Sequence, residues 1–356
     1  MMKEITLGCR IITPLFMGGA NQGAELRTQS FNGLFRYWFR LLGGSFEDEK
    51  RLFGWGGKEA RKGLVYVFCE KKNLNKKLFE KVFDSSGKVI NNRGINYIGF
   101  SLDARFNKNQ HDRPRREYLQ EGQNFNLTIR FHPTANDEDI KKFLSAVWCA
   151  FYLGNFGSRS RRGFGSVVIK EISGYIPNGF NLEFKPSGDI CDWLKKQLKK
   201  IKYLNCWKGR EDIPWIFKNM EIYKVNKDNV KQLNKWIEEV QKDRVQKDGV
   251  QKDGKKPKYL IDNWALSSIN NINDLHDFMG FLMAAYRSYY QPDYETAKDI
   301  IQGKKPQNQL IERVIFGLPL NFYFSSLENP KTGKKGMGAM VEASLGNQKL
   351  RRASPL

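Results

Sequence analysis

The stretch TANDEDIKKFLSAVWCAFYLGNFGSRSRRGFGSVVIKEISGY, residues 134–175, predicts a helix, a loop and a strand in direct succession. Apolar residues recur at i, i+3, i+4 and i+7 in its first half, which predicts a helix that Asn136 or Thr134 caps. Its last ten residues, 166–175, are rich in β-branched residues and predict a strand. Between them, residues 154–165 (GNFGSRSRRGFG) hold four glycines and three arginines.

Outward from this stretch, the same two periodicities recur towards the N-terminus. SFNGLFRYWFRLLG, residues 30–43, has one apolar stripe at helical spacing, with Ser30 as its candidate cap and Gly43 as its candidate end. Four other segments are predicted strands: 4–13, 63–70, 95–102 and 124–132.

The resulting order is strand, helix, two or three strands (the segment 95–102 being the optional one), helix and strand. It matches βαββαβ, the split-βαβ or ferredoxin-like unit, which is an α+β fold related to RRM domains. It predicts an antiparallel sheet with both helices on one face and an open opposite face, as RRM-type RNA binders have. We place this first domain at residues 1–180. The remainder, 181–356, predicts a more helical domain, with helices at 188–204, 228–242 and 273–290. A five-residue repeat lies at about 240–258, where residues 240–257 read VQKDRVQKDGVQKDGKKP. Its composition predicts a flexible insertion.

The charge of the chain favours a polyanionic partner. Its 356 residues include 60 Lys and Arg against 38 Asp and Glu, a formal net charge of +22. Such an excess repels itself unless a polyanion neutralises it, and nucleic acid is the expected one. An anionic membrane surface is a weaker alternative. The apolar runs are too short to span a bilayer. We expect no membrane partner.

Composition also excludes several classes of site. The N-terminal residues lack a continuous apolar segment of the signal-peptide type. The five cysteines are scattered, without a CxxC pair, which argues against a disulfide framework and a zinc site. We expect a cytoplasmic protein without metal, cofactor or catalytic residue.

The loop 154–165 predicts contact with a phosphate backbone. Glycines let the main chain approach a ligand, and successive N–H groups in such loops bind anions. Arginines add forked donors, serines add hydroxyls, and Phe156 and Phe164 are candidates to stack on bases. Neither a Walker A nor a GxGxxG pattern is present, so a polynucleotide fits better than a nucleoside triphosphate. The loop residues proposed for RNA binding are Gly157, Ser158, Arg159, Ser160, Arg161, Arg162 and Gly163.

Two further cationic segments flank regular elements. One is GGANQGAELR, residues 18–27, leading into the helix of residues 30–43; the other is DARFNKNQHDRPRRE, residues 103–117. Arginine side chains there are expected on phosphates, or along the apolar edge of the helix through their stems. They are Arg27, Arg36, Arg40, Arg113, Arg115 and Arg116.

These motifs together resemble the RAMP superfamily of CRISPR proteins. In ELRTQSFNGLFRYWFRLLGG an Arg, a Ser and a polar–Gly pair precede an R-x-W-x-R run, and a Gly-rich loop follows the second helix. With LFGW, FGLPLNF and the terminal RRASPL, the chain resembles RAMP subunits of type III-B (Cmr) effector complexes. The resemblance adds Ser30 and Asn32 to the RNA-binding residues. Asn32 stands where a lysine is common, which weakens one expected phosphate contact.

The resemblance implies two tandem ferredoxin-like domains, the second incomplete if the chain is truncated after Leu356. It also implies guide RNA (crRNA), target RNA and other Cmr subunits as partners. The implied role is to hold the 3′ part of the guide RNA in antiviral defence, while another subunit cleaves the target.

Two alternatives stay open at this point. The chain could be a RAMP-type endoribonuclease that uses His111 as a general base, or Asp103 or Asp112 as a Mg²⁺ ligand. It could also be a scaffold subunit whose charge only solvates its surface. Of the other two histidines, His132 is expected to be structural and His276 to face solvent or a partner.

Overall fold

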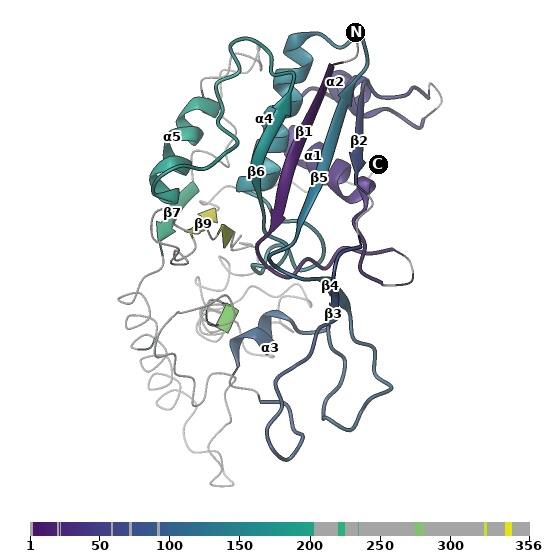
Figure 1. Cartoon of the computed structure of the whole chain (residues 1–356), viewed down its shortest axis with the longest axis vertical. Helices are drawn as coiled ribbons and strands as arrows, with labels where there is room; N and C mark the ends of the chain where they lie inside the picture. The colour runs from purple at the N-terminus through teal and green to yellow at the C-terminus, as the bar shows by residue number, and fades with distance from the viewer. Residues whose placement is uncertain are drawn as a thin grey trace, which may run out of the picture.

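The computed structural model describes most of the first two hundred residues and short pieces of the rest. The described residues are 3–19, 21, 23–57, 60–70, 73–90, 93–202, 220–224, 234, 274, 276, 277, 280, 324–325 and 339–343. Figure 1 shows a sheet in front of two long helices, with a smaller lobe below it.

The main sheet has four antiparallel strands in the order β2-β5-β1-β6. The strands are β1 (Lys3–Ile11), β2 (Val65–Cys69), β5 (Asn124–Phe131) and β6 (Val167–Gly174). Burial alternates along β1 and β5, and Leu7 and Leu127 lie directly opposite each other. Because successive side chains in a strand point to opposite faces, one face of the sheet forms the core.

Helices α1 (Thr28–Leu41) and α4 (Asp137–Tyr152) lie against that face (Figure 1). Phe31, Phe35 and Phe39 of α1 are fully buried in the core. Each such phenylalanine contributes about 1.5–3 kcal/mol through burial. The order β1-α1-β2-β5-α4-β6 is the predicted βαββαβ order, and the fold is an α+β fold with an antiparallel sheet.

The helix ends partly follow the sequence predictions. Asn136 caps α4 in a capping box with Asp139, as predicted. Gly43, with φ of 90°, follows the end of α1, also as predicted. The prediction that Ser30 caps α1 is wrong: the helix begins at Thr28, and the cap residue Arg27 makes no side-chain cap hydrogen bond. Ser30 therefore lies within the first turn.

A lobe, with described residues 79–90 and 93–116, extends from the paired strands β3 (Lys76–Leu78) and β4 (Glu117–Leu119). The strand predicted at 95–102 is wrong, because residues Gly94–Ile98 form the short helix α3. The reason is tertiary: Asp277, far along the chain, accepts a hydrogen bond from the Ile95 N–H at 2.8 Å. An acceptor at that position satisfies one of the N–H groups that a helix start leaves unpaired. Helix α2 (Phe46–Phe53) lies between α1 and β2 in the chain.

The helix predicted at 188–204 is confirmed as α5 (Ile190–Lys202). Although the predicted domain division assigns it to the second half, α5 packs into the core of the first. The Trp193 ring lies 5.8 Å from that of Trp148 and 4.8 Å from that of Tyr152, both on α4.

The second half is described only in part. Strands β7 (Met220–Lys224), β8 (Phe324–Ser325) and β9 (Ala339–Ala343) form a small antiparallel sheet in the order β7-β9-β8. The described positions of the predicted helix 273–290 are helical, whereas the repeat at 240–258 lies outside the described residues. Within the described part of the chain, no helix is long and apolar enough to cross a membrane.

Gly165, at the end of the Gly-rich loop, offers a direct test of the fold. Its φ is +75°, and an added Cβ would overlap the Phe156 carbonyl oxygen. Gly122, with φ of +86° and open space around it, is the matched control. We expect Gly122→Ala to lower the free energy of unfolding by about 1 kcal/mol from backbone strain alone, and Gly165→Ala by more than about 2 kcal/mol. Urea denaturation measures the free energy of unfolding of both variants. Equal losses in the two would contradict the close approach of Gly165 to the Phe156 carbonyl.

Candidate nucleic-acid interface

The Gly-rich loop is seated on the segment that follows β1. The Ser158 N–H donates to the Phe16 carbonyl at 2.8 Å, and the Gly165 N–H donates to the Pro14 carbonyl at 2.9 Å. Gly157 has φ of +80°, and a Cβ there would lie 2.5 Å from the Phe16 oxygen. Glycine is therefore required where the loop meets this segment.

The two phenylalanines of the loop are not available to bases, so that prediction is wrong. Phe156 is 1% exposed and packs 4.8 Å from the Phe31 ring. Phe164 is fully buried, with its ring centroid 5.3 Å from that of Phe16. Both side chains anchor the loop in the core, because burying their apolar surface stabilises the fold.

His276 holds the loop from the other side, and its predicted outward orientation is wrong. It is buried, its Nε2 lies 3.2 Å from the Gly163 carbonyl oxygen, and its ring stacks on Phe164 at 4.6 Å. Burial lowers the pKa of His276 to about 4, against the smaller opposing effect of the Gly163 carbonyl. The neutral imidazole is thus a structural contact between the two halves of the chain.

The loop arginines reach towards the lobe. Arg159 has φ of +58°, and its Nη2 donates to the Phe100 carbonyl at 2.7 Å and to the Ser101 hydroxyl. Arg162 donates to the Ile98 carbonyl at 3.2 Å. Because a carbonyl carries no net charge, the contact orients Arg159 without cancelling its charge. Arg161 is exposed.

Arg36 and Arg40, predicted phosphate ligands on α1, converge on Glu49 of α2. The Arg36 Nε and the Arg40 Nη2 each lie 2.5 Å from Glu49 Oε1, and the Glu49 side chain is only 4% exposed. Burial alone would raise the pKa of Glu49, but hydrogen bonds from Arg40 and Arg36 hold it below its usual value. These two arginines therefore fasten α2 to α1.

Arg27 and Asn32 lie at the start of α1 with local partners. Arg27 Nη1 donates to the Gly18 carbonyl at 3.1 Å, and its Nε lies 3.5 Å from Glu25 Oε1. Asn32 Oδ1 is buried and has no hydrogen-bond partner among the described residues. Arg27 thus braces the turn that precedes α1.

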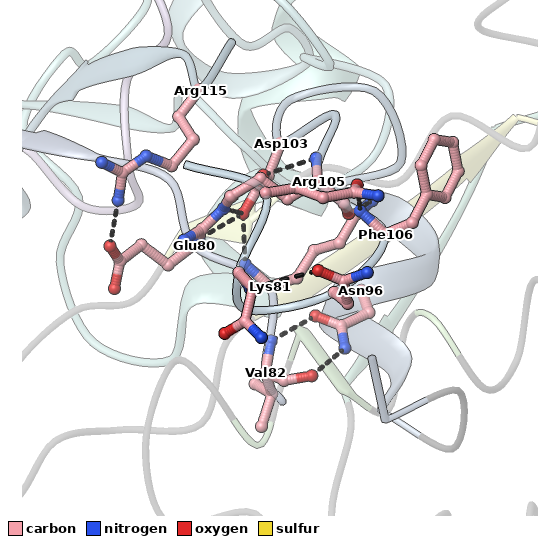
Figure 2. Close-up of polar contacts among 11 residues, drawn as sticks. Glu80, Lys81, Val82, Asn96, Asp103, Arg105, Phe106 and Arg115 are labelled. Atoms are coloured by element: carbon pink, nitrogen blue, oxygen red, sulfur yellow. Dashed lines mark hydrogen bonds and ion pairs between the residues drawn. The ribbon is translucent and has the colours of Figure 1, made fainter. Parts of the chain in front are cut away.

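The lobe is organised around a buried ion pair (Figure 2). Arg105 Nη2 lies 2.7 Å from Asp103 Oδ2, and the Lys81 N–H donates to the same oxygen at 3.0 Å. Asp103 is fully buried and occupied by these donors, so its candidacy as a Mg²⁺ ligand is wrong. The described residues contain no group of three side chains suited to a metal ion.

The remaining residues of the basic segment diverge. Arg115 pairs with Glu80 (Figure 2), and Arg113 is exposed. His111, the candidate base, is exposed on a turn, and Asp112 next to it is also exposed. Only Arg116 among the three predicted arginines turns towards the Gly-rich loop.

Arg116 lines a pocket of about 400 Å³ between α1, the segment after β1 and the Gly-rich loop. Five predicted residues meet there: Ser30, Arg116, Gly157, Ser158 and Ser160. Its other lining residues were not among the predicted RNA-binding residues; they are Phe16, Met17, Gly18, Gly33, Leu34, Tyr37 and Asn155. The motifs GNFG and FRYW contain Asn155 and Tyr37, but neither motif indicates that they meet.

The chemistry of the pocket is that of a binding site for an anion with an organic body. Its lining supplies hydroxyl groups, one guanidinium and one amide, together with apolar and aromatic surface. It holds no carboxylate and no histidine among its lining residues, all of which are described. The pocket can therefore bind a phosphorylated ligand, but it offers no general base of its own.

The sheet, its two helices and the cationic Gly-rich loop beside it define an α+β domain with an antiparallel βαββαβ sheet. Residues 9–168 match the model of the RAMP superfamily. This match agrees with the resemblance to the RAMP superfamily that the motifs of the sequence carry.

Two curated relatives come from Pyrococcus furiosus. The chain is 29% identical over 189 residues to the CRISPR system Cmr subunit Cmr1-2, covering 48% of this chain and 97% of that protein. It is 28% identical over 186 residues to Cmr1-1, covering 49% of this chain and 50% of that protein, about half its length. The fold is similar to the crystal structure of apo Cmr1 from P. furiosus, with a TM-score of 0.53 and 18% identity over 98% of this chain and 91% of that one.

Buried His276 predicts a pH-dependent stability. Its pKa of about 4 lies below the unfolded value near 6.5, so the unfolded chain binds the proton first as the pH falls. The contribution of neutral His276 to the free energy of unfolding is present above about pH 6.5 and is lost as the pH falls towards 4. Between pH 7.5 and 5 we expect a loss of about 2 kcal/mol in the free energy of unfolding.

The matched variant is His276→Gln, which keeps a side-chain N–H for the Gly163 carbonyl but does not titrate. Its unfolding free energy, measured by urea denaturation, should change less with pH over the same range. An identical pH dependence in both proteins would show that His276 does not titrate with folding.

Proposed function

We propose that this chain is a non-catalytic RNA-binding subunit of a type III-B CRISPR (Cmr) effector complex, the first RAMP subunit. The observation that carries the proposal is the pocket where Ser30, Arg116, Ser158 and Ser160 meet beside a cationic loop. The similarity of half of the chain to two Cmr1 subunits supports the assignment to that complex.

The pocket and the loop together suit a ribose-phosphate strand. Hydroxyl and guanidinium donors in the pocket match phosphate oxygens, and Arg161 and Arg159 add positive charge beside it. Phosphate contacts position a strand without reading its sequence. We infer that the site holds the 3′ part of the guide RNA and helps engage target RNA, whose sequence base pairing reads.

The wider assignments follow from the same resemblance. We propose guide RNA, target RNA and the other Cmr subunits as partners, and the cytoplasm as the location. The three-stranded sheet of the second half is consistent with a second ferredoxin-like domain in tandem with the first. The net charge of +22 suits a subunit buried against RNA.

The three arginines of the Gly-rich loop are expected to contact phosphates of the RNA. Replacing Arg159, Arg161 and Arg162 with alanine should weaken binding of single-stranded RNA and reduce its dependence on salt. With each phosphate contact that is lost, fewer counterions leave the RNA on binding. The slope of log K against log salt then becomes flatter by about 0.7 per contact. Fluorescence anisotropy across a salt series measures the slope.

The charge-matched control removes Arg10, Arg130 and Lys170, which lie on β1, β5 and β6. This variant should retain the wild-type slope, because the RNA is proposed to bind at the pocket and the Gly-rich loop and not on the open face of the sheet. A slope that flattens only in the control would instead assign RNA to that face, as in RRM domains.

A further prediction separates binding from cleavage. Purified protein incubated with labelled guide precursor, with and without Mg²⁺, should leave it intact, since the pocket lining contains no general base. Specific products that disappear in His111→Ala would establish the endoribonuclease alternative. Equal retention on heparin and on RNA would favour the scaffold alternative.

A further inference from the structure

One residue that lines the pocket has a polar atom whose missing partner is not a phosphate. Asn155 lines the pocket, is 3% exposed, and donates from Nδ2 to the Ser160 carbonyl at 2.9 Å. Its Oδ1 is buried and has no hydrogen-bond partner within the described structure. A buried acceptor without a partner costs about 1–3 kcal/mol.

The Ser160 contact decides which atom is left over. Turning the amide round would place Oδ1 against the Ser160 carbonyl, so that two acceptors would meet. The unmatched atom is therefore the oxygen, which needs a donor. Phosphodiester oxygens only accept hydrogen bonds, so a phosphate group cannot supply one.

A ribonucleotide carries the missing donor in the 2′-hydroxyl of its ribose. This group both donates and accepts, and it distinguishes RNA from DNA at a given site. The neighbouring Ser158 and Ser160 hydroxyls can rotate to serve either a phosphate or a ribose oxygen. A volume of about 400 Å³ lies within the usual range for small ligands, so the pocket suits a single nucleotide better than a duplex.

Tyr37 provides a place for the base. It lines the same pocket and is 42% exposed, with its ring held edge-to-face against Trp38 at 6.0 Å. An exposed aromatic ring accepts any base by stacking, without selecting its identity.

We propose that the pocket holds one unpaired ribonucleotide, whose 2′-hydroxyl donates to Asn155 Oδ1 while its base stacks on Tyr37. This makes Asn155 the residue by which the site prefers RNA to DNA. The inference rests on the proposed function, since it names the ligand of the same site.

The experiment compares full-length wild-type protein with Asn155→Ala on single-stranded RNA, on DNA of the same sequence with uracil in place of thymine, and on 2′-O-methyl RNA, which lacks the donor. Wild-type should bind RNA about tenfold more tightly than either substitute, as expected for one hydrogen bond of about 1.4 kcal/mol. In Asn155→Ala this ratio should fall towards one, with DNA affinity within about twofold of wild-type.

Asn155→Asp provides a second variant, because it keeps an acceptor at the same place. Its added negative charge, and the loss of the donor to the Ser160 carbonyl, should weaken binding of RNA and DNA alike while the preference for RNA persists. Asn126→Ala, on the exposed face of β5, is the control and should keep both affinity and ratio.

Three results would overturn the inference. An unchanged RNA-to-DNA ratio in Asn155→Ala excludes the contact. Equal losses on both ligands with a lower melting temperature would make Asn155 structural, pairing through water with Trp38 Nε1, a buried donor without a described partner. A change in preference among poly(U), poly(A) and poly(C) at constant ratio would assign Oδ1 to a base N–H.

Failure of the proposed function would look different. In that case wild-type protein would not bind RNA, or the triple arginine variant would leave the salt slope unchanged. If RNA binding and its salt dependence are as expected but the ratio of RNA to DNA affinity is unchanged in Asn155→Ala, only the proposed ribose contact is wrong.

Discussion

The close seating of the Gly-rich loop on the chain after β1 is the constraint on which the candidate site depends. The N–H groups of Ser158 and Gly165 pair with carbonyls of the segment that leaves β1, and positive φ at Gly157 allows the two backbones to approach. Since the same segment leads into α1, this contact brings α1 and the loop together. The pocket lies where they meet.

Buried aromatic rings secure that arrangement from below. Phe156 enters the core beside Phe31, and Phe164 packs between Phe16 and His276. The loop thus has a rigid apolar underside and a cationic, hydroxyl-bearing upper side. Because the loop is already held rigid, it loses less conformational entropy when a strand binds.

Charge in this protein divides into pairs that build the fold and groups that face outward. Glu49 holds Arg36 and Arg40, and Asp103 holds Arg105, in pairs with a deeply buried carboxylate. Removing one partner of such a pair leaves a buried charge uncompensated, which is strongly destabilising. Arg159 and Arg161, by contrast, have no carboxylate partner in the described structure.

The sequence by itself determined the βαββαβ order, the capping of α4 by Asn136 and the Gly-rich loop, because periodicity, caps and turns are local properties of the chain. Only the tertiary structure decided that residues 94–98 form a helix, since Asp277 supplies a hydrogen-bond acceptor at its start. It also decided which arginines pair with buried acids, and that Asn155 and Tyr37 share a pocket. Those contacts join residues far apart in the chain, and no local pattern encodes them.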